Sequence, residues 1–312
     1  MRILVLGAGG TGGYFGGRLV QAGCDVTFLV RPARAARLRS EGLVIRSPLG
    51  DARLEVAVVE SGALTADYDL VLLSCKAYDL EDAIASIAPA MNRRDVTLLP
   101  LLNGLAHFDT LDAAFGASQV LGGLCHISAT LNSAGEVEHL NRLQSLTFGE
   151  RDPSAQSDRC ERFAAAFGRA TFDSRNSSNV LADLWEKFAF MSAGASLTCL
   201  MRASVGKIVS SAEGERVALQ LIEECAAIAR AAGYPPSEKG AGFARHMLAS
   251  KDSAFKASML RDIEAGQRVE ADHLVGDMAR RGRALGSSVD LLEIALAHLR
   301  AYELSRAADS RS

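Results

Sequence analysis

Residues 1–30 read MRILVLGAGGTGGYFGGRLVQAGCDVTFLV, and this stretch decides the fold. The apolar run over residues 3–6 predicts a buried strand, and the run over residues 26–30 predicts the next one. Between them, a glycine turn with the pattern G-x-G-x-x-G leads into a predicted helix that ends at Gly23. A strand, a glycine turn, a helix and a second strand in this order are typical of a βαβ unit that binds a dinucleotide.

Each glycine of this turn has a separate physical role. Gly7 permits the tight turn, Gly9 lets the backbone approach a pyrophosphate, and Gly12 lets the helix pack closely on the strand. The pyrophosphate is expected at the helix N-terminus, where unpaired N–H groups and the helix dipole favour an anion. The expected cofactor-binding residues of the turn are Gly7, Gly9, Gly10, Thr11 and Gly12. The alternative is a glycine-rich turn without a ligand.

The end of the second predicted strand indicates which dinucleotide would bind. NAD sites usually carry an acidic residue there, which binds the ribose 2′-hydroxyl. This chain has VRPAR at residues 30–34 instead, with no acid before Glu41. Because Arg31 and Arg34 could pair with a 2′-phosphate, the sequence favours NADP over NAD. The alternative is that both arginines are ordinary surface charges.

Composition bounds the class of protein. The 312 residues suffice for two domains, and 48% hydrophobic with 23% charged residues is typical of a soluble globular protein. The net charge of -3 does not point to nucleic acid or an anionic membrane, and no apolar run reaches the ~18 residues of a membrane span. The six cysteines and six histidines show no ligand spacing, so we expect reduced thiols, a cytoplasmic location and no metal. The strand that directly follows Met1 predicts no signal peptide.

Two further predicted strands of the first half end in polar residues. The run over 69–74 is followed by Lys76, and the run over 96–102 is followed by Asn103. A helix over 79–90, with Asp79 as its N-cap, lies between them. Ligands of open α/β sheets bind beyond the carboxyl ends of the strands, which makes Lys76 and Asn103 candidate site residues.

The remaining pattern divides the chain into two parts. The first half adds a small hairpin over 43–45 and 54–59, a helix over 105–115, strands over 119–131 and 136–148, a helix over 155–168 and a short strand over 170–173. The second half predicts only helices, over 179–202, 204–211, 214–232, 238–249, 256–265, 269–286 and 289–307. We therefore predict an α/β fold with a Rossmann-type dinucleotide-binding domain over 1–175 and an all-helical substrate domain over 176–312. The active site is expected in the cleft between them.

Three stretches of the helical half carry polar groups that suit chemistry. Lys187 lies in the otherwise apolar helix that contains DLWEKF at residues 183–188. Ser258 begins the stretch SMLRDI and could donate a hydrogen bond to a substrate carboxylate. Glu270 begins the stretch EADH and could hold an ammonium or a hydroxyl group. Taken one at a time, a solvated lysine, a helix cap and a surface charge explain them as well.

Together these stretches resemble the ketopantoate reductase family (2-dehydropantoate 2-reductases) over essentially the whole chain. The resemblance is carried by GAGGTGGYFGGRL at 7–19, CK at 75–76, LNG at 102–104, LWEK at 184–187 and SMLRDIEAGQRVEAD at 258–272, in the family's order and spacing. It implies a helical domain similar to the C-terminal domain of 6-phosphogluconate dehydrogenase. It also implies NADPH-dependent reduction of a 2-oxo acid to a 2-hydroxy acid, and a homodimer.

The resemblance also assigns roles to single residues. Lys187 matches the family's catalytic lysine, and Glu270 matches the acid that works with it. Asn103 matches the asparagine at the nicotinamide and the substrate, and Ser258 matches the substrate-binding serine. Beyond the glycine turn, the cofactor contacts that it implies are Arg31, Lys76, Asn103 and Glu270.

The chain departs from the family at two positions of the lysine helix. The family usually carries asparagines four and eight residues beyond the lysine, facing the substrate, whereas this chain has Met191 and Ala195. Because a lost amide leaves a substrate hydroxyl without its partner, altered substrate recognition is expected.

Three hypotheses about function follow. They are reduction of ketopantoate to pantoate in pantothenate (coenzyme A precursor) biosynthesis, reduction of a more apolar 2-oxo acid, and a non-catalytic NADP-binding sensor. The presence of all four matched site residues argues against the sensor.

Overall fold

The computed structural model describes residues 1–155 and 157–309, and it divides into two compact units. The α/β unit comprises Met1–Leu102 and His107–Val180. The helical unit comprises Asn103–Ala106 and the chain from Leu181 onward. Four residues that interrupt the α/β unit in sequence therefore pack with the helices. The predicted domain boundary between residues 175 and 176 stays a prediction.

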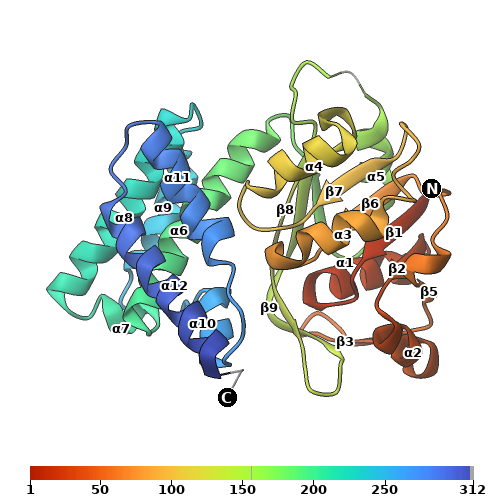
Figure 1. Cartoon of the computed structure of the whole chain (residues 1–312), viewed down its shortest axis with the longest axis horizontal. Coiled ribbons are helices and arrows are strands. Elements are labelled where there is room, and N and C mark those ends of the chain that lie inside the picture. Colours follow the sequence, from red (N-terminus) through yellow and green to blue (C-terminus); the bar gives the residue numbers. More distant parts are fainter. Residues whose placement is uncertain (156, 310–312) are drawn as a thin grey trace. The chain divides into compact units, whose positions relative to one another are not determined.

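The α/β unit is organised around a parallel sheet with the strand order β5-β2-β1-β6-β7 (Figure 1). Its strands are β1 (Arg2–Leu6), β2 (Asp25–Leu29), β5 (Ala57–Val59), β6 (Leu70–Leu73) and β7 (Thr97–Pro100). The helices of the unit are α1 (Gly10–Gln21), α2 (Pro32–Glu41), α3 (Leu80–Ile87), α4 (His107–Phe115) and α5 (Arg159–Phe167). A parallel sheet whose first strand lies at the centre is the arrangement of a Rossmann-type fold, which confirms the predicted fold class.

A second sheet completes the α/β unit, with the order β10-β9-β3-β4 and with β8 paired to β9. Its strands are β3 (Leu43–Arg46), β4 (Ala52–Leu54), β8 (Gly122–Leu131), β9 (Val137–Gly149) and β10 (Asp173–Asn176). Strands β8 and β9 form a long antiparallel hairpin with an irregularity between Ile127 and Ala129.

Helix α1 packs against strands of both sheets. A Cβ added at Gly16 would lie 2.7 Å from the Phe28 ring of β2, and one added at Gly13 would lie 2.6 Å from Val137 Cγ2 of β9. Tyr14 and Phe15 between them are fully buried. The absence of side chains at the two glycines therefore lets both sheets close onto one helix, which joins them in a common core.

Two strand predictions are wrong in detail. The stretch predicted over 54–59 is divided, because β4 ends at Leu54 and β5 joins the parallel sheet, where Ala57 lies opposite Thr27. The strand predicted over 170–173 lies further along the chain as β10, whose sequence DSRN is mostly exposed. Ala170 instead makes a turn, in which its N–H donates to the Phe167 carbonyl. Apolar patterning favours buried residues and therefore missed an exposed edge strand.

Two helix starts also differ from the prediction. Asp79 stands at the N-cap of α3 but makes no side-chain cap bond, and its carboxylate lies 3.5 Å from Arg31 Nη2 instead. The helix predicted from residue 155 begins at Arg159 as α5. Residue 156 of that prediction lies outside the described residues.

The helical unit contains no strand among its described residues. Its helices are α6 (Val180–Met201), α7 (Val205–Ile208), α8 (Ala212–Ala231), α9 (Glu238–Ala249), α10 (Ser258–Glu264), α11 (Asp277–Ala284) and α12 (Asp290–Asp309) (Figure 1). Serine side chains fix two of the helix starts. Ser211 Oγ accepts from Gly214 N at α8, and Ser237 Oγ accepts from Gly240 N at α9.

One predicted helix, over 269–286, has two parts in the structure. A π-helical turn, η4 (Asp272–Gly276), precedes α11 and contacts both α11 and α12. Single π-helical turns inside helices occur frequently at functional sites. Hydrophobic periodicity cannot separate such a turn from an ordinary helix, because both bury residues at similar spacing.

Two adjacent glycines, the N-cap residue of α1 and its first residue, allow a test of this packing. A Cβ at Gly10 would lie 2.4 Å from the Ala129 carbonyl oxygen of β8, whereas one at Gly9 would have no neighbour within 4 Å. We expect Gly10→Ala to lower the free energy of unfolding by about 1–3 kcal/mol, because a backbone group must move. Gly9→Ala, whose backbone is extended at φ -84, should change it by less than about 0.5 kcal/mol. Urea unfolding of both variants measures the difference, and equal stability would contradict the packing described here.

Candidate active site

The glycine turn after β1 has the geometry that an anion site requires. Gly7 has φ +89, which places it in the left-handed region that glycine adopts without strain. A Cβ at Gly12 would lie 2.2 Å from Ser74 Oγ, so Gly12 serves the close packing of α1 on the end of β6. At Gly9 the space beside the backbone is open. The start of α1 has no side-chain cap and no acid in its first turn, which leaves its N–H groups suited to a phosphate.

Gly10 and Thr11 lie at the start of the same helix. Thr11 is half-buried. The missing side chain of Gly10 accommodates the Ala129 carbonyl of the β8–β9 hairpin. The structure thus gives Gly10 a packing role besides the cofactor role that the sequence predicts.

The two arginines after β2 differ sharply in their surroundings. Arg31 is 78% exposed at its side chain and lies near Asp79. Arg34 donates from Nη2 to the Ala8 carbonyl at 2.8 Å and from Nη1 to the Gly135 carbonyl at 2.7 Å. Burial lowers the pKa of Arg34 from its usual value, and the nearby charge of Arg37 acts in the same direction. The prediction that Arg34 pairs with a 2′-phosphate is corrected, because its guanidinium fastens the glycine turn to the β8–β9 turn.

Lys76 follows the strand next to β1. It is the N-cap residue of a short 3-10 helix, η2 (Ala77–Asp79), and is half-buried. Strand β6 pairs with β1 so that Leu73 lies opposite Leu6, and Ser74 Oγ donates to the Leu6 carbonyl at 2.9 Å. Lys76 therefore leaves the sheet at the same edge as the glycine turn.

The helical unit brings together the predicted pair Lys187 and Asn103. Lys187 Nζ, on α6, donates to Asn103 Oδ1 at 3.1 Å. Gly104 has φ +78, and a Cβ there would lie 3.1 Å from the His273 carbonyl oxygen and 3.6 Å from Phe188 Cε2. The Asn103–Gly104 turn therefore lies directly against both α6 and the π-helical turn.

The π-helical turn contributes His273, which the sequence prediction missed. The His273 ring donates a hydrogen bond to the Asn103 backbone carbonyl. Burial lowers the pKa of His273 below its ordinary value, and the negative charges of Glu270 and Asp277 oppose this shift. This shift favours the neutral imidazole. Its signal in the sequence is its place three residues after Glu270, a spacing that puts both on one face of a helix.

Further contacts hold the segment of α6 that carries Lys187. Glu186 Oε2 accepts from Ser237 N at 2.8 Å, which ties α6 to the start of α9. Trp185 stacks on Tyr234, with ring centroids 6.0 Å apart, and lies under the Arg281 guanidinium. The neighbours of Lys187 in sequence are thus fixed by packing on two sides.

The remaining predicted residues of this unit lie at different depths. Ser258 begins α10 and is half-buried, and the preceding Ala257 N–H donates to Thr198 Oγ1 at 3.4 Å. Thr198 lies about three helical turns beyond Lys187 on α6, so Ser258 is set apart from the Lys187–Asn103 pair. Met191 is half-buried, whereas Ala195 is 1% exposed. The burial of Ala195 does not support a direct substrate contact in this conformation.

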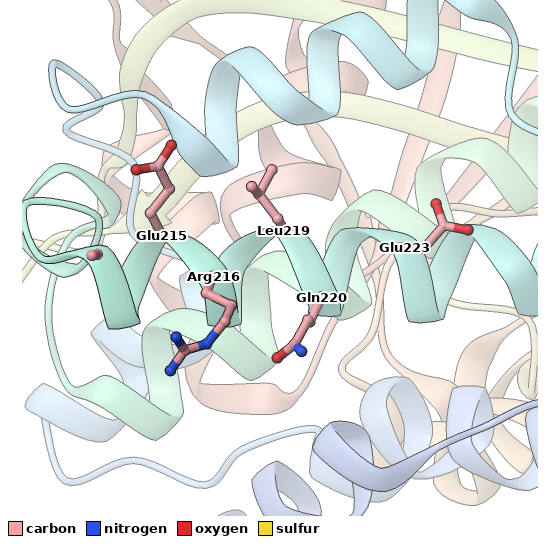
Figure 2. Close-up of a pocket in the computed structure, with 6 residues that line it drawn as sticks. Glu215, Arg216, Leu219, Gln220 and Glu223 are labelled. Atoms are coloured by element: carbon pink, nitrogen blue, oxygen red, sulfur yellow. The ribbon is translucent and has the colours of Figure 1, made fainter.

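Two hollows in the helical unit lie elsewhere. One of about 260 Å³ lies between α6, α8 and α9 and is lined by Glu186, Phe190, Arg230 and Arg245, among others. The other, of about 390 Å³, lies on the outer face of α8. Figure 2 shows that its side chains spread to two sides of the helix, with Arg216 and Gln220 on one side and Glu215 and Glu223 on the other. These polar groups do not converge on one point, and none of the predicted site residues lines either hollow.

The described part of the chain offers neither a metal centre nor a membrane-spanning helix. Among residues 1–155 and 157–309, no group of three or more His, Cys, Asp and Glu could hold a metal ion. No described helix has the length and apolar character that crossing a membrane requires.

Comparison with known proteins matches the chain to one family over most of its length. Residues 3–153 match the family described as "Ketopantoate reductase PanE/ApbA", and residues 179–303 match "Ketopantoate reductase PanE/ApbA C terminal". The oxidoreductase YkpB of Bacillus subtilis, itself uncharacterized, is 36% identical over 98% of this chain and 100% of its own.

Solved structures agree with this match. The crystal structure of a PanE/ApbA family ketopantoate reductase from Ralstonia eutropha is similar with a TM-score of 0.87 and 28% identity, over 98% of this chain and 99% of that one. A D-mandelate dehydrogenase in complex with NADH and anilino(oxo)acetate has a TM-score of 0.86 at 18% identity, over 98% and 99% of the two chains. This last similarity shows a shared fold.

Arg34 provides a test of the contacts around the glycine turn. Arg34→Ala removes two bonds from a half-buried guanidinium to backbone carbonyls, so we expect a loss of about 2–4 kcal/mol in the free energy of unfolding. Arg39→Ala on the same helix removes only an exposed ion pair with Glu60 and should cost less than about 1 kcal/mol. Chemical denaturation of the two variants gives the comparison, and equal losses would show that Arg34 is an ordinary surface residue.

Proposed function

The chain belongs to the ketopantoate reductase family, an oxidoreductase family that acts on a keto or hydroxyl group, and we propose that this member reduces a 2-oxo acid to a 2-hydroxy acid with NADPH. Its default substrate is 2-dehydropantoate (ketopantoate), which would give pantoate for pantothenate biosynthesis. The observation that carries the proposal is the hydrogen bond between Lys187 Nζ and Asn103 Oδ1. It joins a cation and an amide that both match the family's site residues.

Lys187 suits the reduction of a carbonyl. As the C2 carbon is reduced, negative charge develops on the carbonyl oxygen, which needs an electrostatic partner and then a proton. The Lys187 ammonium can supply both, first as a charge and then as general acid, and it recovers its proton from water. Asn103 orients the ammonium because its Oδ1 accepts one of the three N–H bonds, and its amide N–H₂ can donate to a substrate or cofactor oxygen.

Two further residues complete the proposed set for substrate and proton transfer. Glu270 would work with Lys187 as the family's acid, and Ser258 would donate to the substrate carboxylate.

The residues proposed to hold the cofactor fit a dinucleotide. Gly7–Gly12 would receive the pyrophosphate, since Gly9 has open space and the start of α1 has uncapped N–H groups. Lys76 and Arg31 would meet its phosphates, and Asn103 and Glu270 would contact its nicotinamide end. When bound, the cofactor supplies the hydride that reduces the carbonyl carbon.

The choice between NADPH and NADH depends on Arg31 in this proposal. Its exposed guanidinium lies 3.5 Å from Asp79 in a loose surface ion pair, so it can turn to a 2′-phosphate. Arg34 is committed to backbone carbonyls. A D-mandelate dehydrogenase with a similar fold holds NADH, so the fold alone does not select NADPH. The proposed preference for NADPH over NADH therefore depends on Arg31.

A second candidate substrate is a more apolar 2-oxo acid. Met191 is half-buried one helical turn beyond Lys187, where the family usually has an asparagine. A flexible thioether packs on hydrocarbon chains and cannot bond a substrate hydroxyl as an amide does. A non-catalytic sensor is the third candidate. A homodimer and a cytoplasmic location remain expectations from the family and the cysteine pattern.

Activity against a panel of 2-oxo acids tests the function. We expect NADPH oxidation with ketopantoate or a branched-chain 2-oxo acid, and a fall of about 10²- to 10⁴-fold in kcat for Lys187→Ala, because a general acid and charge partner are lost. Lys207→Ala, an exposed lysine on α7, serves as the matched control. NADPH binding, followed by fluorescence, should be retained in both variants. Binding of NADPH without turnover of any 2-oxo acid would support the sensor instead.

Coenzyme kinetics test the role of Arg31. Arg31→Ala should raise KM for NADPH by about 10- to 100-fold, which corresponds to a lost charged hydrogen bond of about 1.5–3 kcal/mol. KM for NADH should stay within about twofold, which makes NADH the internal control. Parallel changes for both coenzymes would exclude Arg31 as the 2′-phosphate ligand.

A further inference from the structure

The Asn103–Gly104 turn is held by the π-helical turn as well as by Lys187. The His273 ring donates to the Asn103 backbone carbonyl, and the His273 carbonyl oxygen lies where a Cβ on Gly104 would approach to 3.1 Å. Leu274 Cδ1 would lie 3.6 Å from the same Cβ. One residue thus contacts the turn through both its side chain and its backbone.

The π-helical turn accounts for the position of His273. A π-helical turn accommodates an extra residue and so changes the direction of the side chains that follow it. The turn begins directly after Ala271, and Leu274 N–H still donates to the Glu270 carbonyl at 3.1 Å. The ring of His273 therefore leaves the helix where it can reach a backbone carbonyl outside the helix.

The charged groups around His273 are themselves engaged. Asp277 is 3% exposed and is bound by Arg280 and by Arg281, whose Nε lies 2.8 Å from Asp277 Oδ2. Asp272 on the same turn pairs with Arg300 of α12 at 2.6 Å. Glu270 is the remaining acid beside the ring. The Asp272–Arg300 pair fixes the π-helical turn to α12, and the pairs of Asp277 hold the first turn of α11, against which the π-helical turn packs. His273 is therefore presented from a rigid support.

We propose that His273 is a positioning residue for the reduction: its imidazole N–H holds the Asn103 backbone, so that the Asn103 amide stays aligned with the Lys187 ammonium. His273 touches neither substrate nor the reacting atoms in this arrangement, and it acts through Asn103. The inference rests on the proposed function for its catalytic meaning. The alignment of Lys187 that it describes can be measured without any substrate.

A positioning role for His273 requires its imidazole N–H donor, whereas a structural role requires only a ring of similar volume. His273→Phe keeps a ring of similar size but removes the N–H, whereas His273→Asn and His273→Gln keep an N–H donor on a shorter or longer arm. A structural role depends on volume and would favour Phe. A positioning role depends on the bond to the Asn103 carbonyl and would favour Asn or Gln. His246→Phe, at an exposed histidine of α9, is the matched control.

Two measurements test the proposal. In steady-state assays we expect kcat for His273→Phe to fall at least about 10-fold with KM for NADPH unchanged, and either amide variant to recover most of it. In pH-dependent acetylation followed by mass spectrometry, Lys187 of His273→Phe should label several-fold faster near pH 8 than in wild type. The reason is that loss of the Asn103 contact removes stabilisation of the charged ammonium. The His246→Phe control should match wild type in both.

The outcomes separate the two proposals. Unchanged kcat and unchanged Lys187 labelling in His273→Phe would overturn the positioning role. So would a result in which the two amide variants are as impaired as Phe or more so. If the wild-type protein reduces no 2-oxo acid, the proposed function fails, and the labelling result alone then decides whether His273 aligns Lys187.

Discussion

The close packing of α1 between two sheets is the constraint on which the rest of the α/β unit depends. The helix carries glycine wherever a strand or turn approaches it, from the β6 end at Gly12 to the Phe28 ring at Gly16. Its buried aromatic residues, Tyr14 and Phe15, then fill the space on its other faces. The start of this helix has no side-chain cap, which suits the proposed anion site, so the stability of the helix comes from packing along its length instead of from its first turn. Packing uses the glycines and buried side chains along α1, whereas the proposed cofactor site uses the N–H groups at its start. The two therefore do not compete for the same groups.

The helical unit has a comparable focus in the Asn103–Gly104 turn. In the sequence this turn lies between two segments of the α/β unit, yet it packs with the helices. It is held by a side chain of α6 and by a side chain of the π-helical turn, so that its own side chain has little freedom. A polar residue that is bonded at both its backbone and its amide loses less conformational entropy when a ligand binds. In the proposed site, Asn103 is preorganised in this sense.

Much of this arrangement was predictable from the sequence, and the exceptions share a cause. The Rossmann-type order followed from apolar runs and the glycine turn, and Lys187 and Asn103 were predicted as site residues although 84 positions separate them. Arg34 was considered as a possible partner of a 2′-phosphate because the sequence alone does not distinguish an arginine that binds backbone carbonyls from one that binds phosphate. His273 was missed because the stretch EADH continues a helical pattern through a π-helical turn. Ala195 was predicted at the substrate because it stands where the family usually has an asparagine. A family match does not report depth; the Ala195 methyl is buried here, and its substrate contact stays a prediction. In each case the pattern gave the residue type, and tertiary contacts decided its role.

In the proposed function, catalysis and substrate choice depend on different positions of one helix, α6. Lys187 is tied to Asn103, and its neighbours Trp185 and Glu186 are fixed against Tyr234 and the start of α9. Met191, one turn further on, belongs to none of these hydrogen bonds. In the proposed function, a thioether in place of an amide at position 191 would alter which substrate chain is tolerated, while Lys187 and its orienting amide would keep their geometry. Discrimination by an apolar contact is worth only about 1–3 kcal/mol, whereas loss of a bonded hydroxyl partner is worth more. A family member that has an apolar contact in place of an amide hydrogen bond at this position is expected to keep its chemistry and to accept a broader range of 2-oxo acids.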